Sequence, residues 1–173
     1  LLTINNAGTI TGNITSGAGD DSVTNTGTIT GDLTLGSGDD SVSNSGTIDG
    51  SINFSTATTS DSLVNNTGAS VTGSVIGTTF SVDNNGTGSI GTVGGTTSTI
   101  DNEGTITNVT STTTTVNTNT GTITNIEAGT VNLTNDEGGS VGTIDAATLL
   151  TINNAGTITG NITSGAGDDS VTN

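Results

Sequence analysis

The most regular part of the chain is a pair of consecutive segments, NAGTITGNITSGAGDDSVTN at residues 6–25 and NTGTITGDLTLGSGDDSVSN at residues 25–44. In each segment, Ile, Leu or Val alternates with Thr, Ser or Asn, which is the period-two pattern of a half-buried strand. Gly and Asn bound the alternating stretches, and Gly, Thr, Asn and Val together disfavour helix. We therefore expect short strands joined by tight turns.

The segment recurs along the chain, inside a longer repeat. Residues 1–25 return unchanged at 149–173, so the longer unit is 148 residues. Three apolar columns run through the shorter repeats. The first column is Ile10, Ile29, Ile48, Val71, Ile90, Ile106, Ile123, Val141 and Ile158. The second column is Ile14, Leu33, Ile52, Val75, Val93, Val109, Ile126, Ile144 and Ile162. The third column is predicted as Ile4, Val23, Val42, Val64, Val82, Ile100, Val116, Leu133, Ile152 and Val171.

These columns predict an all-β fold, a parallel β-helix (β-solenoid). We call one full turn of the solenoid a rung, and expect about eight rungs of 16–23 residues per 148-residue unit, each with three short strands. Parallel strands stack about 4.8 Å apart, so Ile would lie on Ile along a thin core, with each rung packed only against its neighbours. Residues 1–148 then form one full repeat unit and 149–173 begin the next identical one, in a continuous solenoid without a linker. We expect the chain to be a segment of a longer protein.

A recurring Asn-x-Gly motif predicts one corner of each rung. It starts at Asn6, Asn25, Asn44, Asn66, Asn102 and Asn119. Asn and Gly both tolerate the positive φ angles of tight turns. Stacked Asn side chains can in addition hydrogen-bond as a ladder along the rod. The motif is therefore either a simple turn or a turn that also carries a ladder.

The composition excludes several classes of function. There is no Lys, Arg, His, Cys, Met, Trp, Tyr or Pro, and the formal charge is −16. Without cations the chain cannot neutralise phosphates, so we expect no binding to nucleic acid and no attachment to anionic membranes. No apolar run is long enough to cross a bilayer, so no membrane insertion is expected. Carbohydrate-cleaving β-helices need groups that stack on sugars or bind uronates, and without these groups we expect no enzyme.

Units of the type N-x-G-T-I-x-G-x-I-x-x-G-x-G-D-D-S-V-x-N resemble the β-strand repeats of bacterial autotransporter passengers and giant surface adhesins. The resemblance covers essentially the whole chain, most closely residues 1–64 and 149–173. It implies an exported β-helix at the bacterial cell surface or in the extracellular space, with an adhesive or scaffolding role. Adhesin stalks and biofilm-matrix fibres are proteins of this kind, and other cell-surface or matrix components would be their partners.

The Gly-rich loops carry a second resemblance. Residues 17–23 and 36–42 fit G-x-G-x-D-x-U, which is similar to the core of the calcium-binding RTX nonapeptide. In this chain Ser16 or Leu35 replaces the leading Gly, and the copies lie one rung apart instead of one nonapeptide apart. The candidate metal ligands are Asp20, Asp21, Asp39, Asp40, Asp61, Asp168 and Asp169.

Stacking of these acids has a physical consequence. Carboxylates one rung apart repel one another, so either some have raised pKa values or a hard cation such as Ca²⁺ bridges them. Asp21, Asp40 and Asp169 also occupy a column that holds Leu2 and Phe80 in other rungs. The alternative is a solvated turn whose acids point outward.

The sequence thus predicts a structural rod or filament segment, extended end to end by stacked subunits or by covalent tandem repeats. The alternative function is ice binding through outward Thr ladders. The Thr residues concerned are Thr9, Thr28, Thr47, Thr105, Thr122 and the run at 112–115.

Overall fold

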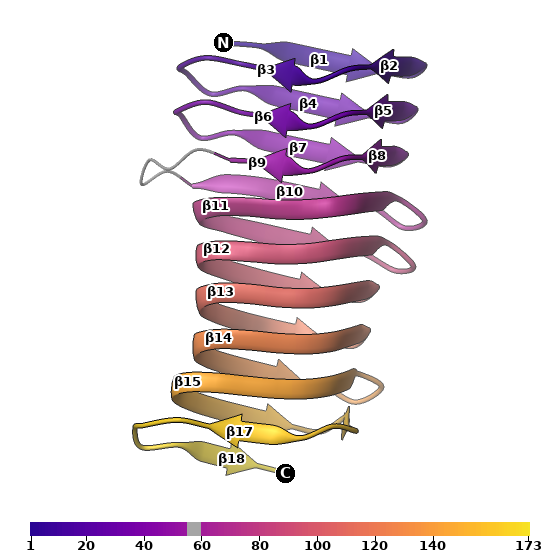
Figure 1. The fold of residues 1–173 in the computed structure, drawn as a ribbon. Helices are drawn as coiled ribbons and strands as arrows, with labels where there is room; N and C mark the ends of the chain where they lie inside the picture. The colour runs from indigo at the N-terminus through magenta and orange to yellow at the C-terminus, as the bar shows by residue number, and fades with distance from the viewer. Residues whose placement is uncertain (55–59) are drawn as a thin grey trace.

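The computed structural model describes residues 1–54 and 60–173 and has the form of a rod (Figure 1). The strands wind about nine times around one axis, and the two termini lie at opposite ends of the rod. All the pairings between the named strands are parallel, and they join these strands into one sheet that follows the winding chain. The described residues contain no helix, and so none that could cross a membrane. The predicted parallel β-solenoid is confirmed.

The first rungs consist of short strands, as predicted. They are β1 (Thr3–Asn6), β2 (Thr9–Thr11), β3 (Ile14–Thr15), β4 (Ser22–Asn25), β5 (Thr28–Thr30), β6 (Leu33–Thr34), β7 (Ser41–Asn44), β8 (Thr47–Asp49), β9 (Ile52–Asn53) and β10 (Asp61–Asn65). The middle of the rod differs, because its strands continue through two corners. They are β11 (Ser70–Asn84), β12 (Ser89–Asn102), β13 (Thr105–Asn119), β14 (Thr122–Asn135) and β15 (Ser140–Asn154). Short strands return in β16 (Thr157–Ile158), β17 (Ile162–Ser164) and β18 (Ser170–Thr172).

The rungs with short strands differ from β12–β15 in the length of one corner. In the first rung Ile10 and Ile14 are separated by three residues, and Gly12 among them has a φ of 116°. In β13 the equivalent Ile106 and Val109 are separated by two residues, and the strand runs on. A positive φ is open to Gly. The extra residue accompanies the break between β2 and β3, whereas β11 has the same spacing between Val71 and Val75 and runs on.

The core is made by the predicted columns, with one correction. The first and second columns stack in register, as in the pairs Ile29 with Ile48 and Val109 with Ile126. In the third column Leu63, not Val64, pairs with Val42 and Val82. A shift of one residue moves a side chain to the other face of a strand. The prediction of Val64 was wrong because two adjacent apolar residues fit the column equally well, and Leu63 is the buried one.

Two further columns line the interior between the second and third columns. The first of them, which we call the variable column, includes Leu35, Phe54, Gly77, Gly95, Ser111, Ala128 and Ala146. The second, which we call the inner Asp column, is Leu2, Asp21, Asp40, Asp61, Phe80, Ser98, Thr114, Val131, Leu150 and Asp169.

Volumes in these two columns are matched. A Cβ on Gly77 would lie 3.1 Å from the ring of Phe80, so a large residue in one column faces a residue without a side chain in the other. Where both positions are polar, the hydroxyls bond to each other: Ser98 Oγ lies 2.7 Å from Ser111 Oγ and 3.0 Å from Thr114 Oγ1.

The Asn corner is a hydrogen-bonded ladder as well as a turn. Each Asn Nδ2 donates to the Oδ1 of the Asn one rung later, over distances of 2.6–2.9 Å. The ladder is Asn6, Asn25, Asn44, Asn65, Asn84, Asn102, Asn119, Asn135, Asn154 and Asn173. Stacked amides satisfy each other because every one carries both a donor and an acceptor.

The ladder corrects one predicted residue and adds others. Asn66 lies outside it, and its Nδ2 donates to Ser45 Oγ at 2.9 Å instead. The turn that begins at Asn65 is longer than the turn of the Asn-x-Gly motif, so Gly is not the second residue after the ladder Asn. Asn65 Nδ2 donates to the main-chain oxygen of Ala69, four residues further along. Asn84 and Asn135 were missed for the same reason, since both precede longer turns.

Candidate functional site: inner and outer aspartates

The two Asp residues of each GxGDD loop point to opposite sides of the solenoid wall. Consecutive residues in extended backbone alternate between the two faces. Asp20 and Asp39 are therefore exposed, while Asp21 and Asp40 are 2% and 1% exposed. Asp61 joins the buried set at 2% exposed. The prediction that the acids stack from rung to rung is confirmed for this inner set, but the alternation separates inner from outer carboxylates.

The inner carboxylates act as acceptors for main-chain groups of the preceding rung. Asp21 N donates to Asp40 Oδ1 at 2.8 Å, and Asp40 N donates to Asp61 Oδ1 at 3.0 Å. Leu2 N donates to Asp21 Oδ1 at 2.5 Å in the same way. These residues lie in loops, where the main-chain hydrogen bonds of the sheet are interrupted. A side-chain carboxylate therefore supplies the acceptor that a main-chain carbonyl supplies within the strands.

The outer carboxylates bond in the reverse direction. Asp39 N donates to Asp20 Oδ1 at 2.9 Å, and Ser60 N donates to Asp39 Oδ1 at 3.0 Å. The outer acids thus connect each rung to the following one. Together the two sets hold the loop edge of the first rungs, where strands are short.

One oxygen of two inner carboxylates lacks a partner. Asp21 Oδ2 and Asp40 Oδ2 are buried and accept no hydrogen bond. Burial raises the pKa of Asp40, and the charges of Asp61, Asp21 and Asp20 add to the effect against the bond from Asp21 N. The Ser16 hydroxyl, followed by the Leu2 amide, lowers the pKa of Asp21. Leu35 takes the place of Ser16 one rung later, so Asp40 lacks this hydroxyl.

A calcium ion needs more oxygens than two stacked carboxylates supply. Ca²⁺ takes six to eight oxygen ligands. Among the described residues no three acidic side chains come together in a group that could hold a metal ion. Asp168 is exposed, and Asp169 repeats the inner bond by accepting from Leu150 N at 2.9 Å. Calcium binding by these loops stays a prediction, to be tested in solution.

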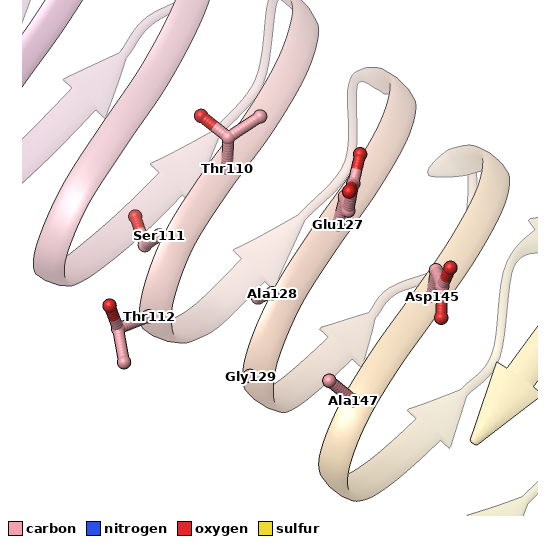
Figure 2. Close-up of a pocket in the computed structure, with 8 residues that line it drawn as sticks. All are labelled: Thr110, Ser111, Thr112, Glu127, Ala128, Gly129, Asp145 and Ala147. Atoms are coloured by element: carbon pink, nitrogen blue, oxygen red, sulfur yellow. The ribbon is translucent and has the colours of Figure 1, made fainter. Parts of the chain in front are cut away.

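A shallow hollow lies on the outer surface of the later rungs (Figure 2). Its volume is about 320 Å³, and Glu127 and Asp145 project beside it from successive rungs. The small residues Gly129 and Ala147 leave the space open. The hollow was not predicted from the sequence, because the spacing of the repeat does not show where small residues will face solvent.

A column of hydroxyls runs along the side of the rod formed by β2, β5 and β8. It is Thr9, Thr28, Thr47, Ser70, Ser89, Thr105, Thr122, Ser140 and Thr157. We call it the outer hydroxyl column. Every position is Ser or Thr, which includes the predicted Thr residues of this side. The predicted run at 112–115 differs, because Thr114 points into the core and is fully buried.

Comparisons with known proteins give no match: neither protein-family models, nor curated proteins, nor solved structures resemble this chain. The function must therefore be argued from the geometry.

Proposed function

We propose that this chain is a segment of a structural rod outside a bacterial cell, an adhesin stalk or a matrix fibre built by stacking identical rungs. The observation that supports it is the recurrence of the inter-rung contacts at the long repeat. Thr3 pairs with Ser22 and Ile4 with Val23 near one end, and Thr151 pairs with Ser170 and Ile152 with Val171 near the other.

Hydrogen bonds of the side chains recur with the same period. Asn6 Nδ2 donates to Asn25 Oδ1 at 2.8 Å, and Asn154 Nδ2 donates to Asn173 Oδ1 at 2.6 Å. A unit that ends in the register in which it began can be repeated without a change of geometry. Solenoids are stabilised by such neighbour contacts, so a longer array would be a longer rod of the same kind.

The composition supports a location outside the cell. With no Lys or Arg the chain offers trypsin-like proteases no cleavage site, and with no Cys or Met it lacks the most easily oxidised side chains. The net charge of −16 keeps rods from adhering to one another along their sides. Adhesion to other surface or matrix components would then be a property of the faces or of other parts of the protein.

Proteins with added tandem units test the axial part of this proposal. A chain continued after residue 173 with residues 26–173 contains one more unit, and a third copy adds another. Electron microscopy should show rods that lengthen by roughly 38 Å per unit, eight rungs at about 4.8 Å. Separate globules joined by flexible segments, or a length that does not grow with the copy number, would overturn the proposal.

Ice binding is a second candidate, and the outer hydroxyl column favours it. Nine successive rungs present a hydroxyl at the same position, in a regular array that could match ordered water. Asp49 interrupts the neighbouring outward column, where it follows Thr30. Thermal hysteresis that is lost in Thr105→Lys, but kept in the Glu137→Lys control, would support this function, whereas its absence in the unmodified chain would exclude it.

A further inference from the structure

The inner Asp column and the Asn ladder solve the same geometric problem with different chemistry. Both stack one short side chain per rung inside the solenoid wall. In the ladder, Asn25 Nδ2 spans the gap to Asn44 Oδ1 at 2.9 Å. An ionised Asp has the same shape but only acceptors, so a column of carboxylates cannot bond to itself.

The structure shows the consequence of this missing donor. Asp21 Oδ2 and Asp40 Oδ2 are buried without a partner, although both Oδ1 atoms accept main-chain bonds. A buried acceptor without a bond destabilises the folded state, because it has lost its hydrogen bonds to water. Two of them on adjacent rungs call for one bound species that serves both.

We propose that Asp21 and Asp40 share one proton, with Asp40 neutral and its Oδ2–H donated to Asp21 Oδ2. A single proton then gives both unpartnered oxygens a hydrogen bond, and the pair repeats the Asn-to-Asn contact across one rung. A bond of this kind between an acid and a carboxylate is short and strong.

The surroundings favour a proton over a metal ion. A metal ion needs several more oxygen ligands, but the positions opposite Asp40 and Asp61 in the variable column are Leu35 and Phe54, both buried and apolar. Calcium would therefore lack ligands in the interior, whereas a proton requires only the two carboxyl groups.

The charged groups around the pair agree with this assignment. The nearby charges of Asp61, Asp21 and Asp20 act on the Asp40 carboxyl group. The chain contains no Lys, Arg or His to neutralise these carboxylates. Negative neighbours and burial favour a neutral Asp40, while the Ser16 hydroxyl and the Leu2 amide favour an ionised Asp21. The directions of the two pKa shifts agree with a proton held by Asp40 and not by Asp21.

Infrared spectroscopy of the intact chain tests the proposal. At pH 7 the unmodified protein should show the C=O stretch of a protonated carboxyl group. Asp40→Asn should lack this band, and Asp39→Asn should keep it. The control makes the same Asp-to-Asn substitution at the adjacent, exposed residue, which also accepts a main-chain bond. No band in the unmodified protein, or a band that survives in Asp40→Asn, would overturn the proposal.

Thermal unfolding and calcium supply an independent arm. The amide introduced by Asp40→Asn carries the donor permanently, so this variant should have a melting temperature at pH 7 roughly 2–4 °C above that of Asp39→Asn. Added CaCl₂ or a chelator should change neither the band nor this difference. Loss of the band on adding calcium, with stabilisation that Asp40→Asn abolishes, would show that a metal ion occupies the column instead.

Discussion

The side-chain amide of Asn84 donates a hydrogen bond of 2.8 Å to Oδ1 of Asn102, one rung further along the rod. The same Nδ2 also lies within 3.1 Å of the main-chain oxygen of Gly88 and 3.2 Å of that of Thr105. Asn84 is fully buried, so each of these polar atoms depends on the others for a partner. Asn84 Oδ1 in turn accepts from Asn65 Nδ2 of the preceding rung, so one amide joins three consecutive rungs.

Removing this amide should be costly. Asn84→Ala removes one of the acceptors of Asn65 Nδ2 and the side-chain donor to Asn102 Oδ1, and we expect a loss of about 2–3 kcal/mol in the free energy of unfolding. Asn66→Ala is the matched control, since Asn66 is half-buried and outside the ladder, and should cost less than about 0.5 kcal/mol. Denaturant unfolding followed by circular dichroism measures both, and equal losses would contradict a role of the ladder in stability.

The fit of Phe80 against Gly77 predicts a coupled pair of substitutions. A Cβ at residue 77 would lie 3.0 Å from Phe54 Cβ and 3.1 Å from the Phe80 ring, so Gly77→Ala should cost about 1–3 kcal/mol through overpacking. Phe80→Leu alone leaves a cavity. The double variant should be more stable than the sum of the two single effects predicts, as measured by a double-mutant cycle. Strict additivity would show that the two positions do not share volume.

The buried hydroxyls of Ser98, Ser111 and Thr114 should respond differently to single and triple changes. Ser98→Ala leaves the other two hydroxyls without their partner, and we expect a loss of about 1–2 kcal/mol in the free energy of unfolding. Replacing all three by Ala, Ala and Val removes every polar atom, and should restore most of the stability. Val131 already occupies the next position of the same column, so the core accepts an apolar residue there. A triple variant less stable than Ser98→Ala would refute this account.

Asp83 and Asp101 form a pair of acids on adjacent rungs, and they predict that the stability of the fold depends on pH. Partial burial, followed by the charge of Asp101 on the next rung, raises the pKa of Asp83 above 3.8. The folded state therefore binds this proton more tightly than the unfolded state. The stability that this proton on Asp83 contributes is complete below pH 3.8 and is lost as pH rises through the raised folded pKa.

Asp83→Asn should then stabilise the protein at pH 7 by a few tenths of a kcal/mol, in the range of cross-strand pairs. It should have little effect below pH 3.8. Glu137→Gln changes the net charge equally at an exposed turn and serves as the control. Melting temperatures measured from about pH 3 to about pH 8 check the prediction, which fails if the two variants have the same pH profile.

The sequence predicted the winding of the chain because the repeat is periodic and its apolar residues are β-branched. Ile29 and Ile48 had to stack, since the same pattern of side chains and turns returns at each rung. The prediction failed for Val64 and Asn66, where two similar residues stand next to each other. Periodicity gives the spacing of a pattern, but the register within an irregular rung depends on which residue packs better in three dimensions.

The site was predicted less completely than the fold. The stacking of Asp21 on Asp40 followed from their spacing of one rung, and the hydrogen bond between Asp21 N and Asp40 Oδ1 agrees with it. The sequence did not show that the residue beside each carboxylate makes their pKa values differ. Ser16 supplies a hydroxyl to Asp21, and Leu35 at the equivalent position supplies none to Asp40. That contrast depends on which side chains meet across the interior.

The sequence alone therefore determined the solenoid, its three sides and its repeat, because period-two alternation and regular turns are local properties that recur. Only the tertiary structure decided which Asn residues form the ladder, which carboxylates are buried and which volumes face one another. These properties depend on the interior of the solenoid. Side chains from different sides of a rung pack together there without water, and each buried polar atom needs a hydrogen-bond partner within that interior.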